Sequence, residues 1–128
     1  MGREGRRRGR LSRSGDFERV FREGHSHGNR YLVLYAFPRP DPSPERPLRL
    51  GISVGRKIGN AVQRNRVKRV LREIFWAASE QLPDGHDFVL VARPDIAGLV
   101  EREGSAGTRA AVEDAIAGAG LPGPGGEG

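Results

Sequence analysis

The stretch of residues 51–76 constrains the fold most, because it combines many cations with a regular apolar pattern. When residues from Arg64 onward are placed on a helix at about 100° per residue, two opposite faces separate. One face is apolar and holds Val67, Val70, Leu71, Ile74, Phe75 and Ala78, and the other is polar and holds Arg64, Asn65, Lys68, Arg69 and Arg72. The pattern predicts a long helix, over residues 60–82, that packs through one face and offers the other to an anion.

Charge is distributed unevenly along the chain. The formal charge is +6, with 19 basic and 7 acidic side chains up to Trp76, and 3 basic and 9 acidic side chains after it. Phosphates attract a basic segment of this kind over the screening length of the solution, whereas solvated surfaces usually mix both signs. We therefore expect a nucleic-acid partner, with a merely solvated basic surface as the alternative.

Apolar runs on both sides of this helix indicate strands. In residues 30–37 and 48–54 apolar side chains alternate, which places Leu32, Leu34 and Ala36 on one face of the first strand and Tyr35 and Phe37 on the other. The segment of residues 87–92, DFVLVA, is continuously apolar after Asp87, as in a strand covered on both faces. The order strand, helix, strand predicts a parallel pair joined by a crossover.

The length of 128 residues fits one domain, which we expect over residues 14–117. It starts with a short helix from Ser14 to about Gly24 and ends with a helix over residues 108–117, capped by Ser105 or Thr108. Residues 1–13 are predicted to form a flexible Arg-rich arm, and residues 118–128 a disordered Gly/Pro tail.

No group of residues stands out as catalytic. His25 and His27 lie in a glycine-rich segment without a third ligand, and His86 is isolated, so a protein-held metal is not expected. No phosphate-binding glycine motif is present, no cysteine suggests disulfides, and no apolar run reaches membrane-spanning length. These features predict a cytoplasmic binding protein without a membrane segment or a small-molecule cofactor.

Two questions stay open at the level of the residues. The basic helix could enter a DNA major groove or lie across RNA phosphates, although flanking strands favour an RNA-binding α/β sandwich over a helix-turn-helix. Phe17 and Phe21 share one side of the first helix, and they and Tyr35 could equally belong to the core or stack on bases.

The run GNAVQRNRVKR at residues 59–69, followed by LRE at 71–73, resembles the signature of the bacterial ribonuclease P protein subunit. Three segments before the signature also resemble the family, in the order RLSRSGDFERVFREG, NRYLVLY and LGISVGRKIGN. The resemblance covers residues 10–94 in continuous order. Gly55 stands where the family usually has a serine, and the final helix is rich in Gly and Ala where the family has a charged one.

The resemblance implies an α+β fold, a two-layer sandwich of α-β-β-β-α-β-α order with a left-handed βαβ crossover. It also implies an accessory role in an endoribonuclease, in which the protein joins a catalytic RNA that removes the 5′ leader of precursor tRNA. The RNA would carry the chemistry and, with the substrate, hold the Mg²⁺ ions, so no protein residue is expected to be catalytic. A non-catalytic RNA-binding protein of a ribosome-like particle is the alternative.

The resemblance further implies two sets of binding residues. Contact with the catalytic RNA would involve Asn60, Arg64, Asn65, Arg66, Lys68, Arg69 and Arg72. The leader of precursor tRNA would bind in a cleft between the first helix and the sheet, with Phe17, Phe21 and Tyr35 in it. Arg56 and Lys57 would also belong to the leader-binding set, near the leader or the catalytic RNA. Arg93 is a weaker candidate.

Overall fold

The computed structural model of the chain describes residues 8–10, 14–38, 48–83 and 85–121. Its helices are α1 (Ser14–Glu23), α2 (Ala61–Ala77) and α3 (Ile96–Gly118), with short 3-10 helices η1 (Arg56–Ile58) and η2 (Ser79–Gln81) on either side of α2. Its strands are β1 (Arg8–Arg10), β2 (His25–Gly28), β3 (Leu32–Pro38), β4 (Leu48–Ser53) and β5 (His86–Ala92). Most of the predicted arm and tail lies outside the described residues.

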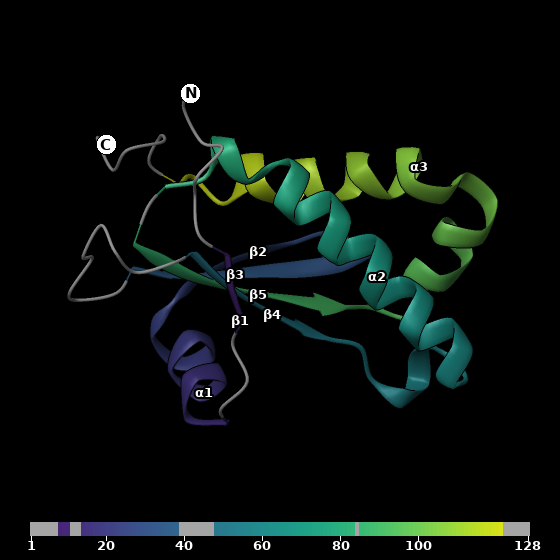
Figure 1. Ribbon diagram of the computed structural model, residues 1–128, viewed down its shortest axis with the longest axis horizontal. Helices are drawn as coiled ribbons and strands as arrows, with labels where there is room; N and C mark the ends of the chain where they lie inside the picture. Colours follow the sequence, from purple (N-terminus) through teal and green to yellow (C-terminus); the bar gives the residue numbers. More distant parts are fainter. Residues whose placement is uncertain (1–7, 11–13, 39–47, 84, 122–128) are drawn as a thin grey trace.

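The described strands form one mixed sheet in the order β1-β4-β5-β3-β2 (Figure 1). β4 and β5 run parallel, with Leu50 opposite Phe88, and α2 connects them, so the predicted parallel pairing through a crossover is confirmed. β3 pairs antiparallel with β5 and with β2. The α+β class and, after β1, the α-β-β-β-α-β-α order are confirmed. The left-handed sense of the crossover stays a prediction from the resemblance.

Helices cover both faces of the sheet. α2 and α3 lie over one face, and α1 packs against β3 and β5 on the other (Figure 1). The larger core lies under α2 and α3 and is built chiefly by the fully buried Leu34, Leu71, Phe75, Phe88 and Leu90. A smaller core under α1 contains Val20, Phe37 and Val89. Because burial of each large apolar side chain contributes about 1.5–3 kcal/mol, α2 is held firmly on the sheet.

The predicted alternation along the strands is confirmed. Leu32, Leu34 and Ala36 of β3 are buried in the larger core, whereas Phe37 is in the smaller core and Tyr35 packs against it. Most of β5 is buried, as expected for a strand covered on both faces. α1 begins at Ser14 and ends at Glu23, in agreement with its predicted range.

Two helix boundaries differ from the predictions. α2 ends at Ala77 instead of residue 82, because Ala78 leaves the helical conformation and the Ser79 hydroxyl donates to the Trp76 carbonyl at 2.8 Å. α3 begins at Ile96, well before the predicted residue 108. Glycines weaken the intrinsic helix propensity of this segment, but Ile96 is fully buried in the larger core, and tertiary packing of this kind outweighs propensity.

The start of the final helix was also predicted wrongly. The helix bends at Gly104, whose φ of 60° and ψ of −147° are open only to glycine. Thr108 is fully buried inside the helix, and its hydroxyl donates to the Gly104 carbonyl at 2.7 Å, so Thr108 is not the cap.

Two short strands were not predicted from the sequence. β1 takes Arg8–Arg10 from the predicted arm and pairs parallel with β4, and β2 forms where the residue pattern suggested a loop.

Candidate nucleic-acid interface

The first turn of α2 is stabilised by a reciprocal pair of hydrogen bonds. The Gln63 amide N–H donates to Asn60 Oδ1 at 2.8 Å, and the Asn60 amide N–H donates to Gln63 Oε1 at 2.9 Å. Together they form a capping box, which satisfies two backbone donors that a helix start would otherwise leave without partners. Asn60 therefore has a structural role, in addition to the RNA contact expected from the resemblance.

The exposed side of α2 carries the cations predicted from the sequence. Val67, Leu71, Ile74 and Phe75 turn into the core, and the opposite residues Asn65, Arg66, Arg69 and Arg72 are exposed, with Arg64 and Lys68 half-buried. Arg64 also donates from Nε to the Gly59 carbonyl at 3.2 Å, which ties its side chain to the start of the helix. We refer to Arg64, Asn65, Arg66, Lys68, Arg69 and Arg72 as the cationic face.

Within the described part of the chain, ion pairs with neighbouring acids do not neutralise the charges of the cationic face. Among the residues that the structure describes, Arg66, Lys68, Arg69 and Arg72 form no ion pair with a carboxylate. The first turn of α2 also lacks an acidic residue. A row of arginines and a lysine without such partners suits phosphate groups, because a guanidinium donates two parallel hydrogen bonds to phosphate oxygens.

The predicted aromatic residues come together on the other face of the sheet. The ring centroids of Phe17 and Phe21 are 6.2 Å apart, and those of Phe21 and Tyr35 are 4.9 Å apart with a T-shaped interplanar angle of 71°. Phe17 and Tyr35 are half-buried against the smaller core, whereas Phe21 is 43% exposed. We call these three residues the aromatic cluster. Phe21 presents apolar surface to solvent, as expected of a stacking residue.

A close backbone approach places Phe21 over Tyr35. The Gly24 amide N–H donates to the Val20 carbonyl at 2.9 Å and ends α1. A Cβ at Gly24 would lie 2.6 Å from the carbonyl oxygens of both Val20 and Ala36, so only glycine allows α1 to end this close to β3. The geometry of the aromatic cluster therefore depends on Gly24.

One polar pair on the α1 side of the sheet was not predicted. Arg49 of β4 donates from Nε to Asp87 Oδ1 at 2.9 Å and from Nη2 to Asp87 Oδ2 at 2.7 Å. Asp87 is only 1% exposed, and it pairs with Phe37 in the register of β3 and β5. A carboxylate next to a continuously apolar run is the sequence signal that could have revealed the pair, because buried charges need partners.

Arg56 and Lys57 lie apart from the aromatic cluster. Both are exposed in η1, which follows the end of β4 and precedes α2. The register aligns Tyr35 with Val89 and Val89 with Gly51, so the cluster lies near the middle of the strands. The structure thus groups Arg56 and Lys57 with the start of α2. Gly55 is exposed and a Cβ there would meet nothing within 4 Å, so packing does not explain the missing serine.

The other candidates have structural contacts. Arg93 is exposed, and its Nη1 donates to the Asn29 carbonyl at 2.6 Å. Near it, Arg30 donates from Nε and Nη2 to Asp95 Oδ2 at 3.2 and 3.1 Å, and this hydrogen bonding raises the pKa of the Arg30 guanidinium because it favours the charged form. Within the described ranges, no three His, Cys, Asp or Glu side chains gather in a way that could hold a metal ion.

The described helices were compared with the length and hydropathy that a membrane-spanning helix needs. No helix in the described part of the chain is both long enough and apolar enough to cross a bilayer.

Known proteins match this chain in sequence and in fold. A family model described as Ribonuclease P matches residues 6–115. The ribonuclease P protein component of Bacillus pumilus is 39% identical over 98 residues, covering 77% of this chain and 80% of the relative. That of Ligilactobacillus salivarius is 43% identical over 88 residues, covering 69% of this chain and 75% of the relative.

Solved structures agree with this similarity. The Staphylococcus aureus RNase P protein, with 30% sequence identity, superposes with a TM-score of 0.75 over 88% of this chain and 95% of that protein. The Thermotoga maritima RNase P protein, with 34% identity, superposes with a TM-score of 0.71 over 82% of this chain and 92% of that protein. The chain therefore belongs to the ribonuclease P protein component family.

Proposed function

We propose that this chain is the protein subunit of ribonuclease P and helps a catalytic RNA remove the 5′ leader of precursor tRNA. The observation that carries the proposal is the position of two different RNA-compatible surfaces on opposite sides of one sheet. α2 and α1 lie on opposite faces of the sheet (Figure 1). The cationic face is on the exposed side of α2, and the aromatic cluster is formed by α1 and β3. One protein can then hold the catalytic RNA and the substrate at the same time, without competition for a single surface.

The cationic face binds the catalytic RNA in this proposal. Its arginines and lysine are presented on a rigid helix, so several phosphates can be contacted without ordering a flexible segment first. Each contact releases condensed counterions, and the affinity should fall steeply with salt. Arg56 and Lys57, next to the start of α2, extend the same positive surface.

The aromatic cluster binds the leader in this proposal. An unpaired RNA segment has exposed base faces, and stacking on aromatic side chains holds such bases with little dependence on sequence. Phe21 supplies the exposed ring, and Phe17 and Tyr35 support it. Only precursor tRNA carries the leader, so this surface would distinguish substrate from product.

Hydrolysis is assigned to the RNA. Mg²⁺, when bound, would activate the attacking water and stabilise the leaving oxygen, and we propose that phosphates of the catalytic RNA and the substrate hold it. Phosphate oxygens are hard ligands that suit Mg²⁺. The cationic face would assist indirectly, because neutralising RNA phosphates lowers the Mg²⁺ concentration needed to fold and pair the two RNAs.

Reconstitution tests this function. The full chain is mixed with a bacterial ribonuclease P RNA and labelled precursor tRNA, at a Mg²⁺ concentration too low for the RNA alone. Cleavage at the mature 5′ end is the expected result, and no stimulation over the RNA alone would contradict the proposal. A protein of a ribosome-like particle would bind RNA in a parallel assay without stimulating cleavage. A DNA-binding regulator would prefer duplex DNA in competition at fixed salt.

A further inference from the structure

Trp76 is the only tryptophan of the chain and lies in the last turn of α2. Its neighbour Phe75 is fully buried in the larger core, whereas Trp76 is half-buried and packs on the rim of that core. The two rings meet edge to face, with centroids 5.3 Å apart and an interplanar angle of 81°. Phe75 thus fills the core position, and the indole stays at the surface of the helix.

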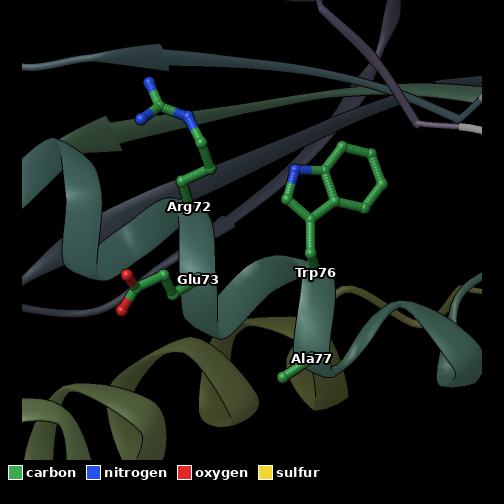
Figure 2. Close-up of a pocket in the computed structure, with 4 residues that line it drawn as sticks. All are labelled: Arg72, Glu73, Trp76 and Ala77. Carbon is green, nitrogen blue, oxygen red and sulfur yellow. The ribbon is translucent and has the colours of Figure 1, made fainter.

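The indole forms one wall of an open pocket. The pocket measures about 520 Å³, and the described residues that line it are Arg72, Glu73, Trp76 and Ala77 (Figure 2). In Figure 2 the side chains of Arg72 and Trp76 leave α2 on the same side, and the Glu73 carboxylate points away from them. A flat aromatic wall beside a guanidinium offers a stacking surface and a phosphate donor together.

The pocket continues the cationic face. At about 100° per residue, Asn65, Arg69 and Arg72 lie within about 60° of one another and of Trp76 along α2. These three residues are exposed, so an RNA strand that follows them would reach the indole at the end of the helix. This charge pattern favours a polyanion with planar groups over an apolar peptide.

We propose that the pocket binds an unpaired nucleotide of the RNA docked on α2, whose base stacks on the Trp76 indole while Arg72 contacts an adjacent phosphate. This inference rests on the proposed function, because it takes the RNA on the cationic face to be the catalytic RNA. The pocket volume suits one nucleotide, and stacking without base-edge hydrogen bonds makes the site tolerant of sequence. Trp76 would add a base contact to a face otherwise built for phosphates.

Tryptophan fluorescence tests the site directly, since all indole emission comes from Trp76. The full chain is titrated at low salt with a bacterial ribonuclease P RNA, with a short oligouridylate, and with an abasic oligomer of the same length and charge. We expect quenching by the ribonuclease P RNA and by oligouridylate, but little by the abasic oligomer. Unchanged emission at saturating ribonuclease P RNA, or equal quenching by the abasic oligomer, would overturn the site.

Two substitutions separate stacking from packing. Trp76→Leu keeps an apolar side chain against Phe75 and should weaken binding of the ribonuclease P RNA about tenfold, whereas Trp76→Phe should keep most of the affinity. Neither change should alter the salt dependence, because no charge is removed, while Arg72→Gln should flatten it. Thermal melting checks that the variants are folded. Equal affinity of Trp76→Leu and the unaltered chain would refute the proposal.

The reconstitution assay keeps the two proposals distinguishable. Stimulated cleavage without Trp76 quenching would reject the pocket and leave the subunit function standing. Quenching and a Trp76→Leu defect without stimulated cleavage would support a nucleotide site on α2 and reject the ribonuclease P function.

Discussion

Arg49 and Asp87 form a two-point ion pair across β4 and β5, with N–O distances of 2.9 and 2.7 Å, and Asp87 is almost completely buried. The pair lies on the α1 side of the sheet, in the same row as Phe37. It allows a charged side chain to occupy the central strand, and it links the strand that precedes α2 to the strand that follows it.

Removing one member of this pair should destabilise the protein strongly. Arg49→Gln leaves the buried Asp87 carboxylate without its guanidinium, which we expect to lower the free energy of unfolding by about 3 kcal/mol. Urea denaturation followed by circular dichroism measures it. The double variant Arg49→Gln with Asp87→Asn should recover part of the loss, because the buried charge is gone. A loss below about 0.5 kcal/mol in the single variant would show that solvent already screens the pair.

Asn60 should contribute to stability independently of RNA. Asn60→Ala removes the acceptor for the Gln63 amide and should cost about 1 kcal/mol in urea denaturation. Asn60→Asp is the matched control, because aspartate also caps helices but adds a negative charge next to the RNA surface. It should retain stability and weaken binding of ribonuclease P RNA. If Asn60→Ala leaves stability unchanged, the capping box has no energetic role.

Charge removal on the cationic face should change both affinity and its salt dependence. Arg66→Gln or Arg69→Gln should weaken binding of ribonuclease P RNA and reduce the slope of log K against log salt by about 1. Filter binding over a series of salt concentrations gives the slope. Arg109→Gln, an exposed arginine on α3, is the control and should leave the slope unchanged. An unaltered slope in both α2 variants would exclude phosphate contacts by these residues.

Truncation in the aromatic cluster should affect precursor tRNA selectively. Phe21→Ala removes the most exposed ring of the cluster and should weaken binding of precursor tRNA by about 1 kcal/mol or more, with mature tRNA unaffected. The measured quantity is the ratio of the two affinities for the reconstituted enzyme. Val62→Ala truncates another exposed apolar side chain, on α2, and should leave the ratio unchanged. Equal weakening of both tRNAs by Phe21→Ala would indicate a purely structural role.

Much of the fold could be predicted because its signals are local. Alternation along β3 and β4 and the helical spacing of Val67, Leu71 and Ile74 come from the backbone geometry of each element, and the structure confirms them. The first half of α3 was not predicted, because it is stabilised by contacts with residues distant in the sequence. Its glycines weaken the helix by themselves, and burial of Ile96 and Leu99 against the rest of the core stabilises it.

The sequence predicted the exposed cations of the candidate site but left the exposure of its aromatic residues undecided. The exposure of Arg66, Arg69 and Arg72 follows from the amphipathic pattern of α2, and the structure agrees. The residue pattern left Phe21 and Tyr35 undecided between core and surface, because packing partners distant in the sequence determine exposure. Arg56 and Lys57 were expected near the leader or the catalytic RNA, and the structure places them beside the start of α2, so the expected contact stays a prediction.

By itself, the sequence determined the class of the protein. A basic amphipathic helix between apolar strands, with a signature spanning residues 59–69, was enough to predict the family and the orientation of α2. Only the tertiary structure decided which residues meet. Arg49 pairs with Asp87, Phe21 lies on Tyr35, and Trp76 stays on the rim of the core beside Arg72. Periodicity assigns a residue to a face, but contacts between strands and helices depend on register and packing, which the whole chain sets together.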